Sequence, residues 1–195
     1  MGEVCRRDDR VPDFGSLQTI SACKYEVRMN DGEVKRTENI YEGGCTCGVV
    51  RYRMQSRPMI VHCCHCHWCQ RQTGTSYALN ALIEADRVTL LQGEPEMIAT
   101  PSPSGKGQNI FRCPSCHIAV WSNYSAASDK VHFIRVGTLD EAHQLPPDIH
   151  IYTSSKQPWV VIPVGHSSVE EYYDRKKYWP EESLERRKRI LGIPG

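Results

Sequence analysis

Clustered cysteines constrain this chain more than any other feature of its sequence. Most of its ten cysteines fall into three groups: Cys45-x-Cys47, the run "VHCCHCHWCQ" at 61–70, and Cys113-x-x-Cys116. Pairs separated by one or two residues are poorly placed to bridge remote segments as disulfides. They are well suited to bind a metal, because two short-spaced pairs supply four thiolates to one tetrahedral ion. The spacing therefore predicts metal sites rather than a disulfide framework.

The first and third groups together have the form of a structural metal site, in which the protein supplies all four ligands. Cys45/Cys47 and Cys113/Cys116 both lie beside strand-like runs, with Gly44, Gly48 and Pro114 in the adjoining turns. Structural zinc takes four such ligands, usually from two hairpins. We expect these four cysteines to bind one zinc ion.

The middle group differs because its three cysteines, Cys64, Cys66 and Cys69, follow a C-x-C-x-x-C pattern that we expect on one continuous loop. Three ligands from one side leave a fourth coordination position for water or substrate, as in catalytic zinc sites. Cys63 or His62 could instead fill that position and make a second structural site. An iron–sulfur cluster is the other alternative, although no ferredoxin-type spacing is present.

Composition limits the classes of partner. The chain has 195 residues, a net charge of +1 and a pI near 7.6, which argues against a strong overall attraction to nucleic acid or anionic membranes. No apolar run is long enough for a membrane span, and the charged N-terminal residues do not resemble a signal peptide. We expect a cytoplasmic protein with no membrane partner, the nucleus being the alternative location.

Short β-branched and aromatic runs separated by turn residues predict a mainly β domain. We expect a hairpin at 24–36 around Asn30-Asp31-Gly32 within an N-terminal extension of residues 1–40, and a zinc-binding domain over 41–165. Within that domain the expected strands cover 50–54, 58–63, 76–83, 87–93, 96–100, 109–113, 118–124, 130–137, 149–153 and 159–164.

Residues 166–195 form a highly charged tail with helical character. Pro180 suits the beginning of a helix and Gly192 its end. The i,i+4 pairs Glu171/Arg175, Glu182/Arg186 and Glu185/Arg189 predict ion pairs along a solvated face. The basic run "RRKR" offers the alternative of a phosphate-binding or nuclear-import patch.

Four segments together resemble the glutathione-dependent formaldehyde-activating enzyme family, which also includes centromere protein V: "GGCTCGVVRY", "CHCHWCQRQTG", "FRCPSCHIAVW" and "VGTLDEAHQLPPDIHIYTSSKQPW". The resemblance covers roughly residues 41–165. It implies a β-tent-like fold of short antiparallel sheets with two zinc ions. Cys45, Cys47, Cys113 and Cys116 would bind the structural ion, and Cys64, Cys66 and Cys69 the catalytic one. It also implies carbon–sulfur lyase activity, the reversible addition of glutathione to formaldehyde.

This chain departs from the family pattern at His117, where members commonly have glycine. We interpret His65 as a catalytic residue and Gln70, Arg71, Tyr152 and Trp159 as substrate-binding residues.

The expected partner is a small molecule such as glutathione, and a homodimer is compatible with the sequence. Two alternatives stay open: a related enzyme with another small-molecule substrate, and a non-enzymatic zinc scaffold.

Overall fold

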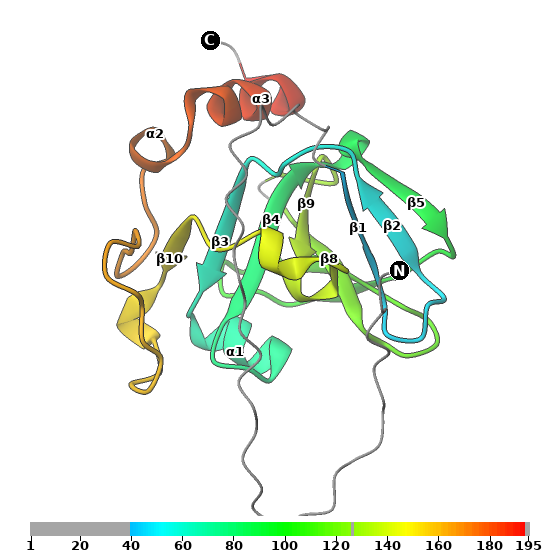
Figure 1. Ribbon diagram of the computed structural model, residues 1–195, viewed down its shortest axis with the longest axis horizontal. Helices are drawn as coiled ribbons and strands as arrows, with labels where there is room; N and C mark the ends of the chain where they lie inside the picture. The colour runs from blue at the N-terminus through cyan, green and yellow to red at the C-terminus, as the bar shows by residue number, and fades with distance from the viewer. Residues whose placement is uncertain (1–39, 126, 194–195) are drawn as a thin grey trace, which may run out of the picture. The chain divides into compact units, whose positions relative to one another are not determined.

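The computed structural model describes residues 40–125 and 127–193 (Figure 1). The hairpin predicted around Asn30-Asp31-Gly32 lies outside the described residues. The mainly β prediction is confirmed, and the C-terminal helix is present. No helix in the described part of the chain is long and apolar enough to cross a membrane.

The strands form two sheets. The smaller sheet has the order β1 (Tyr41–Gly44), β2 (Arg51–Met54) and β5 (Val88–Gln92), all antiparallel. The larger sheet has the order β10-β3-β4-β9-β8-β7-β6. Its strands are β3 (Ile60–Cys64), β4 (Ala78–Glu84), β6 (Glu96–Thr100), β7 (Gln108–Arg112), β8 (Ala119–Tyr124), β9 (Val131–Arg135) and β10 (Ile149–Ile151). Its neighbours are antiparallel except β10 and β3, which are parallel.

Helices are few and short. They are α1 (His67–Thr73), α2 (Arg175–Tyr178) and α3 (Glu181–Leu191), with 3₁₀ turns η1 (Ala85–Arg87), η2 (Val136–Thr138), η3 (Ala142–Gln144) and η4 (Thr153–Ser155). Helix α1 was not expected, because its seven residues are too few to give a clear helical period. It contains Cys69, so the second cysteine group does not lie on a simple loop.

Most of the expected strands are confirmed within a few residues of their predicted ends, but the strand expected at 159–164 is wrong. That segment contains no strand. Val161 is 84% exposed and Val164 is fully exposed. An apolar run becomes a strand only where a neighbouring strand offers hydrogen-bond partners, and this run pairs with none in the described structure.

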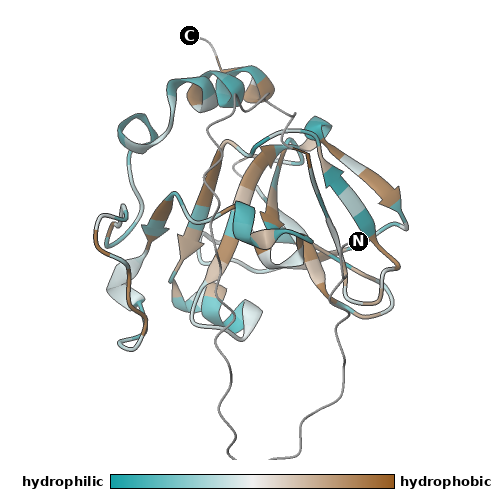
Figure 2. Cartoon of the chain, viewed as in Figure 1, coloured by the Kyte–Doolittle hydropathy of each residue, from teal (hydrophilic) through white to brown (hydrophobic). Residues whose placement is uncertain are grey.

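The core consists of two apolar clusters. In Figure 2 parts of β3 and β4 are brown, whereas β2, which contributes Tyr52 and Met54, is largely teal. The first cluster joins both sheets; within it Tyr52 and Trp121 meet edge to face with ring centroids 5.7 Å apart. The second cluster lies around β3 and β4 and includes Tyr173 and Trp179 from the tail. The tail therefore shares the core of the β domain.

Helix α3 begins after Pro180 and ends at Gly192, as predicted. Its ion pairs differ from those expected. Arg186 is buried and binds Glu84 of β4 through two hydrogen bonds of 2.8 and 2.6 Å, while Glu185 pairs with Lys188.

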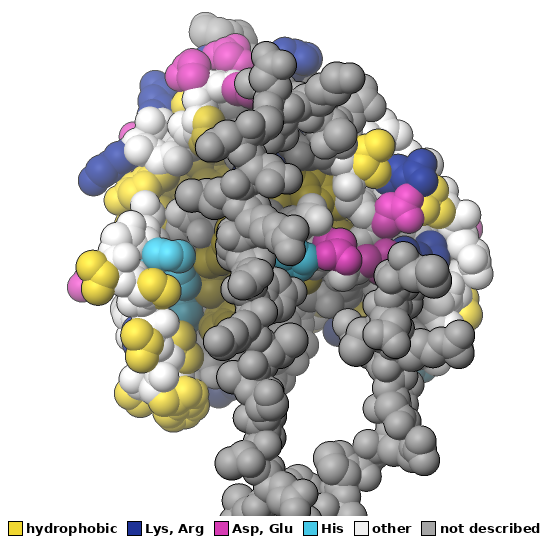
Figure 3. Space-filling view, viewed as in Figure 1, with side chains coloured by type: hydrophobic (Ala, Val, Ile, Leu, Met, Phe, Trp, Pro, Cys, Tyr) yellow, Lys and Arg dark blue, Asp and Glu magenta, His cyan; other side chains and the backbone are white. Residues whose placement is uncertain are grey.

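The predicted pairs Glu182/Arg186, Glu185/Arg189 and Glu171/Arg175 are therefore wrong: none is formed among the described residues. A partner on the sheet competes better for Arg186 because the pair is shielded from water. The outer surface of α3, at the top of Figure 3, carries interspersed acidic and basic side chains, as a solvated helical face should.

Candidate metal centres and the adjoining cavity

The structure brings Cys45, Cys47, Cys113 and Cys116 together, with all four sulfur atoms within 4.8 Å of one another. The Sγ atoms of Cys45 and Cys47 are 3.5 Å apart, and those of Cys47 and Cys113 are 3.6 Å apart. Four thiolates around one tetrahedral zinc would be separated by about 3.8 Å, given zinc–sulfur bonds of about 2.3 Å. The donor set and its spacing therefore fit a zinc ion.

Two tight turns present these sulfurs. Cys45 and Cys47 lie between β1 and β2 of the smaller sheet, and Cys113 and Cys116 lie between β7 and β8 of the larger one. The backbone NH of Val50 donates to the Cys45 sulfur at 3.3 Å. A Cβ on Gly44 would lie 2.3 Å from the Val50 carbonyl oxygen, so only glycine fits this turn. A metal bound here would tie the two sheets together.

The departure at His117 has a conformational explanation. His117 has a φ of +60°, in the left-handed region that favours glycine. Its NH donates to the Cys113 carbonyl at 2.9 Å, closing the turn that holds Cys113 and Cys116. This chain therefore keeps the backbone geometry of a glycine turn with a bulkier residue.

The second group consists of Cys64, Cys66 and Cys69, whose sulfurs also lie within 4.8 Å of one another. Cys64 ends β3, Cys66 is the N-cap of α1, and Cys69 lies within that helix. The NH of Cys69 donates to the Cys66 sulfur at 3.4 Å. A strand end followed by a helix start thus aims three thiols at one point.

No fourth Cys, His, Asp or Glu from the described residues joins this group. Side chains alternate along β3. Cys63 lies instead with His65 and His150: its sulfur is 3.5 Å from His65 Nε2, which is 3.0 Å from His150 Nδ1. The two imidazole ring planes are 21° from parallel, and the 3.0 Å between the two nitrogens suits an N–H···N hydrogen bond.

His62, the other alternative fourth ligand, directs Nε2 to the Tyr173 hydroxyl at 2.6 Å. It therefore has a hydrogen-bond partner outside the cysteine group.

The three thiols strongly affect one another's ionisation. Contacts with Cys64 and Cys69 lower the pKa of Cys66, and the pKa of Cys64 is raised, chiefly by its contact with Cys66. Without a cation, one thiolate is therefore favoured at the expense of its neighbours. A bound metal ion would supply the positive charge needed to ionise all three.

A cavity of about 350 Å³ adjoins the second group. Its lining includes all three of these cysteines, several aromatic rings and one charged side chain. The lining residues are His62, Cys64, Cys66, Trp68, Cys69, Asn80, Ser102, Pro103, Ser104, Tyr124, Phe133, Ile151, Tyr152, Tyr172 and Arg175. The three-thiol group therefore faces a space that can admit a small molecule.

Of the predicted substrate-binding residues, Tyr152 lines this cavity. It has a φ of +56°, a conformation that is costly for a bulky residue and recurs at functional sites. The NH of Tyr152 donates to the Glu171 carbonyl at 3.1 Å, which helps hold it there.

The other candidates lie elsewhere. Gln70 donates hydrogen bonds to the carbonyls of His65 and Ser155 and so connects two loops. The Arg71 side chain is exposed, and Trp159 is 70% exposed. His65 is completely buried beside Cys63 and does not line the cavity. The structure thus separates these four side chains from the space beside the three cysteines.

Sequence reasoning missed Tyr172 and Arg175, which line the cavity from the C-terminal segment. The sequence predicts only an ion pair with Glu171 for Arg175, and no pattern distinguishes Tyr172 from the other aromatic residues of the tail.

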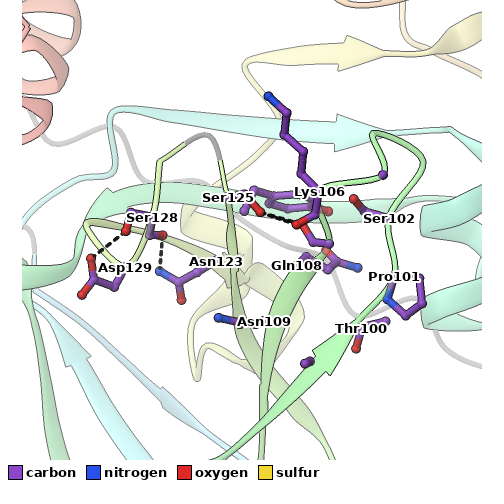
Figure 4. Close-up of a pocket in the computed structure, with 14 residues that line it drawn as sticks. Thr100, Pro101, Ser102, Lys106, Gln108, Asn109, Asn123, Ser125, Ser128 and Asp129 are labelled. Carbon is purple, nitrogen blue, oxygen red and sulfur yellow. Dashed lines mark hydrogen bonds between the residues drawn. The ribbon is translucent and has the colours of Figure 1, made fainter.

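A larger cleft of about 800 Å³ lies between the 100–108 loop and residues 123–125 and 128–129 (Figure 4). Its lining is mainly small polar side chains, with Lys106 and Asp129 as its charged residues. It contains neither cysteine nor histidine. The cavity beside Cys64, Cys66 and Cys69 is therefore the better candidate for chemistry.

One relative and one family model agree with the motifs. A protein from Halomonas elongata named "Putative glutathione-dependent formaldehyde-activating enzyme" is 28% identical over 128 residues, covering 63% of this chain and 81% of that protein. A crystal structure of a Rhodobacter sphaeroides protein aligns with a TM-score of 0.38 and 16% identity, over 51% of this chain and 88% of that one. The family model for the glutathione-dependent formaldehyde-activating enzyme matches residues 40–155. The chain therefore belongs to the glutathione-dependent formaldehyde-activating enzyme family.

Proposed function

We propose that this protein is a zinc-dependent enzyme that adds a thiol, such as that of glutathione, to formaldehyde or another small carbonyl compound. The observation that carries this proposal is the group of Cys64, Cys66 and Cys69, which lines a cavity and includes no fourth protein ligand from the described residues. Family membership supports the same reaction class.

Two metal sites follow from the donor sets. Cys45, Cys47, Cys113 and Cys116 would hold a structural zinc, and Cys64, Cys66 and Cys69 would hold a second one with an open position. When bound, this second ion supplies a positive charge that stabilises a thiolate or polarises a carbonyl.

The reaction is an addition without oxidation or reduction. A carbon–sulfur bond forms, the carbonyl π electrons move to oxygen, and the thiol proton ends on that oxygen to give a hydroxymethyl thioether. Tyr152 and Tyr172 line the cavity, and a tyrosine hydroxyl there would be able to hydrogen-bond to the oxygen that gains charge. Aromatic side chains make up much of the rest of the lining and lower its polarity.

Metal analysis combined with an adduct assay tests this proposal. Purified protein should contain about two equivalents of zinc, as two four-coordinate sites require. Exchange NMR with isotope-labelled formaldehyde and glutathione should show adduct formation faster than in buffer, and Cys66→Ser should remove the acceleration. Two zinc equivalents without acceleration would point to another small-molecule substrate.

A non-enzymatic scaffold is less well supported. Such a protein has no need for an open metal position, and a fourth ligand from Cys63 or His62 would favour it. Cys63 lies with His65 and His150, and His62 is paired with Tyr173.

A further inference from the structure

Arg175 is the single charged residue among those lining the cavity beside the three cysteines. It forms no ion pair within the described part of the chain, whereas Arg186 on the same tail is fully paired with Glu84. Its guanidinium instead lies against Tyr172, 5.4 Å from the ring centroid, with Nη2 3.3 Å from the hydroxyl. A guanidinium held at a cavity without a carboxylate partner is suited to bind an anion.

The segment that carries Arg175 is firmly attached to the domain. Residues 167–171 run beside β10 and η4, where the NH of Val169 donates to the His150 carbonyl and the NH of Thr153 to the Val169 carbonyl. Farther along, the Tyr173 hydroxyl contacts His62 and accepts a hydrogen bond of 2.7 Å from Trp179 Nε1. Arg175 therefore lies in a part of the cavity wall that is attached to the domain on both sides, by residues 167–171 and by Tyr173 with Trp179.

The backbone also fixes Arg175 locally. Asp174 caps α2, its carboxylate accepting from the NH of Lys176 at 3.0 Å. The Arg175 carbonyl accepts from the NH of Trp179 at 2.8 Å. These two hydrogen bonds hold the backbone on either side of Arg175, the first residue of α2.

The rest of the cavity lining complements a small organic acid. The three cysteines form one part of the lining, and aromatic residues together with Ser102 and Ser104 form much of the remainder. No aspartate or glutamate lines the cavity to repel an anion. Its volume of about 350 Å³ lies at the small end of the range for ligand sites, about 300–1,000 Å³.

We propose that Arg175, supported by Tyr172, recognises a carboxylate on the thiol substrate, whose sulfur lies toward Cys64, Cys66 and Cys69. Both residues lie beyond residues 40–155, which match the family model, so the C-terminal segment sets substrate preference. This inference rests on the proposed function only in assigning a thiol substrate to this cavity. Arg175 is a specificity residue here and takes no part in bond making.

Matched ligands test the inference by binding alone. Isothermal titration of the full, zinc-loaded protein with mercaptopropionate and with its methyl ester compares two thiols that differ in the negative charge. The wild-type protein should bind the acid more tightly, by about 10- to 100-fold, the range for a charge-assisted bidentate contact. Arg175→Gln should remove this preference while leaving affinity for the ester and zinc content unchanged.

Lys176→Gln is the matched control, because it removes the same charge from the neighbouring, exposed residue. It should keep the preference for the acid. Arg175→Lys should retain only part of it, since an ammonium group cannot form the two parallel hydrogen bonds of a guanidinium.

Equal binding of acid and ester by the wild-type protein, or a preference that survives in Arg175→Gln, would overturn the inference. The binding measurements test the recognition of a carboxylate by Arg175, whereas the adduct assay tests the proposed reaction, so the two proposals can fail independently. A charge preference that depends on Arg175 in a protein that does not accelerate adduct formation would uphold the recognition site and reject formaldehyde as the carbonyl partner.

Discussion

His62 Nε2 and the Tyr173 hydroxyl lie 2.6 Å apart, although the two residues are separated by 111 positions in the chain. Both side chains are buried, and Trp179 Nε1 donates to the same hydroxyl. This three-residue contact joins the strand that leads to Cys64 with the segment that carries Arg175. The tail is therefore a structural part of the candidate site.

Tyr173→Phe tests that junction. The substitution leaves the polar atoms of His62 and Trp179 without their buried partner, at a cost of about 1–3 kcal/mol in the free energy of unfolding. Urea unfolding should show this loss. Tyr178→Phe is the control, because the Tyr178 hydroxyl makes no hydrogen bond among the described residues. Equal stabilities of the two variants would show that the hydrogen bonds contribute little.

Cys113→Ser should prevent the domain from folding. Loss of one thiolate from a closed four-cysteine site removes metal-binding free energy on the order of 10 kcal/mol, which is comparable to the stability of a whole domain. Circular dichroism and metal content of the purified variant measure the effect, and strong chelation of the wild-type protein should produce the same unfolding. A variant with the wild-type melting temperature would refute a structural role for Cys113.

Cys66→Ser should have a different effect. We expect loss of one zinc equivalent and of thiol-addition activity with most of the fold retained, because β3 and α1 also make apolar contacts in the second core cluster. Near-ultraviolet circular dichroism and metal analysis distinguish the two effects. If Cys66→Ser melts the domain as completely as Cys113→Ser, the second metal site is structural as well.

Arg186→Ala should be among the most damaging substitutions outside the cysteine groups. It leaves the buried Glu84 carboxylate without its main partner, which costs about 3–5 kcal/mol in such pairs. Chemical denaturation at neutral pH measures the loss. Arg189→Ala, on the exposed side of the same helix, should change stability by less than about 0.5 kcal/mol.

The same pair predicts sensitivity to acid. Burial alone would raise the pKa of Glu84, but the hydrogen bonds from Arg186 outweigh it and lower that pKa below its ordinary value. A lowered folded-state pKa stabilises the protein above the unfolded-state pKa, about 4.3 for glutamate, and this stabilisation disappears as pH falls through the folded-state value. The unfolding free energy should therefore fall more steeply below about pH 4 in wild type than in a Glu84→Gln variant.

His117→Gly should stabilise the protein, because it places glycine where φ is already +60°. A non-glycine residue in the left-handed conformation costs about 1 kcal/mol, and part of this is offset because glycine makes the unfolded chain more flexible. We expect a gain of about 0.5 kcal/mol at constant zinc content, measured by thermal unfolding. A lower melting temperature would show that the His117 side chain contributes favourable contacts.

Local patterns predicted the parts of this fold that depend on near neighbours. Alternation and β-branched composition located most strands, and Pro180 and Gly192 bounded α3. The cysteine spacings predicted the two groups that the structure assembles, because short-spaced ligands depend on single turns. The strand prediction for 159–164 is wrong because the apolar character of a segment does not reveal whether another strand lies beside it.

Contacts between distant residues could not be predicted in this way. Nothing in "ERRKR" distinguishes Arg186, which pairs with Glu84 across 102 positions, from its exposed neighbour Arg189. The same holds for Arg175, whose place in the cavity depends on the docking of Tyr173 and Trp179. The structure was needed to show that the tail completes the site.

The position of Arg175 also has a consequence for synthesis of the protein on the ribosome. All seven cysteines of the two candidate metal centres precede Ser125, so every candidate metal ligand is synthesised before the tail. The cavity has its complete wall only after Tyr172 and Arg175 have left the exit tunnel. A chain whose translation stops near residue 165 would therefore carry the metal ligands without the side chains that complete the cavity.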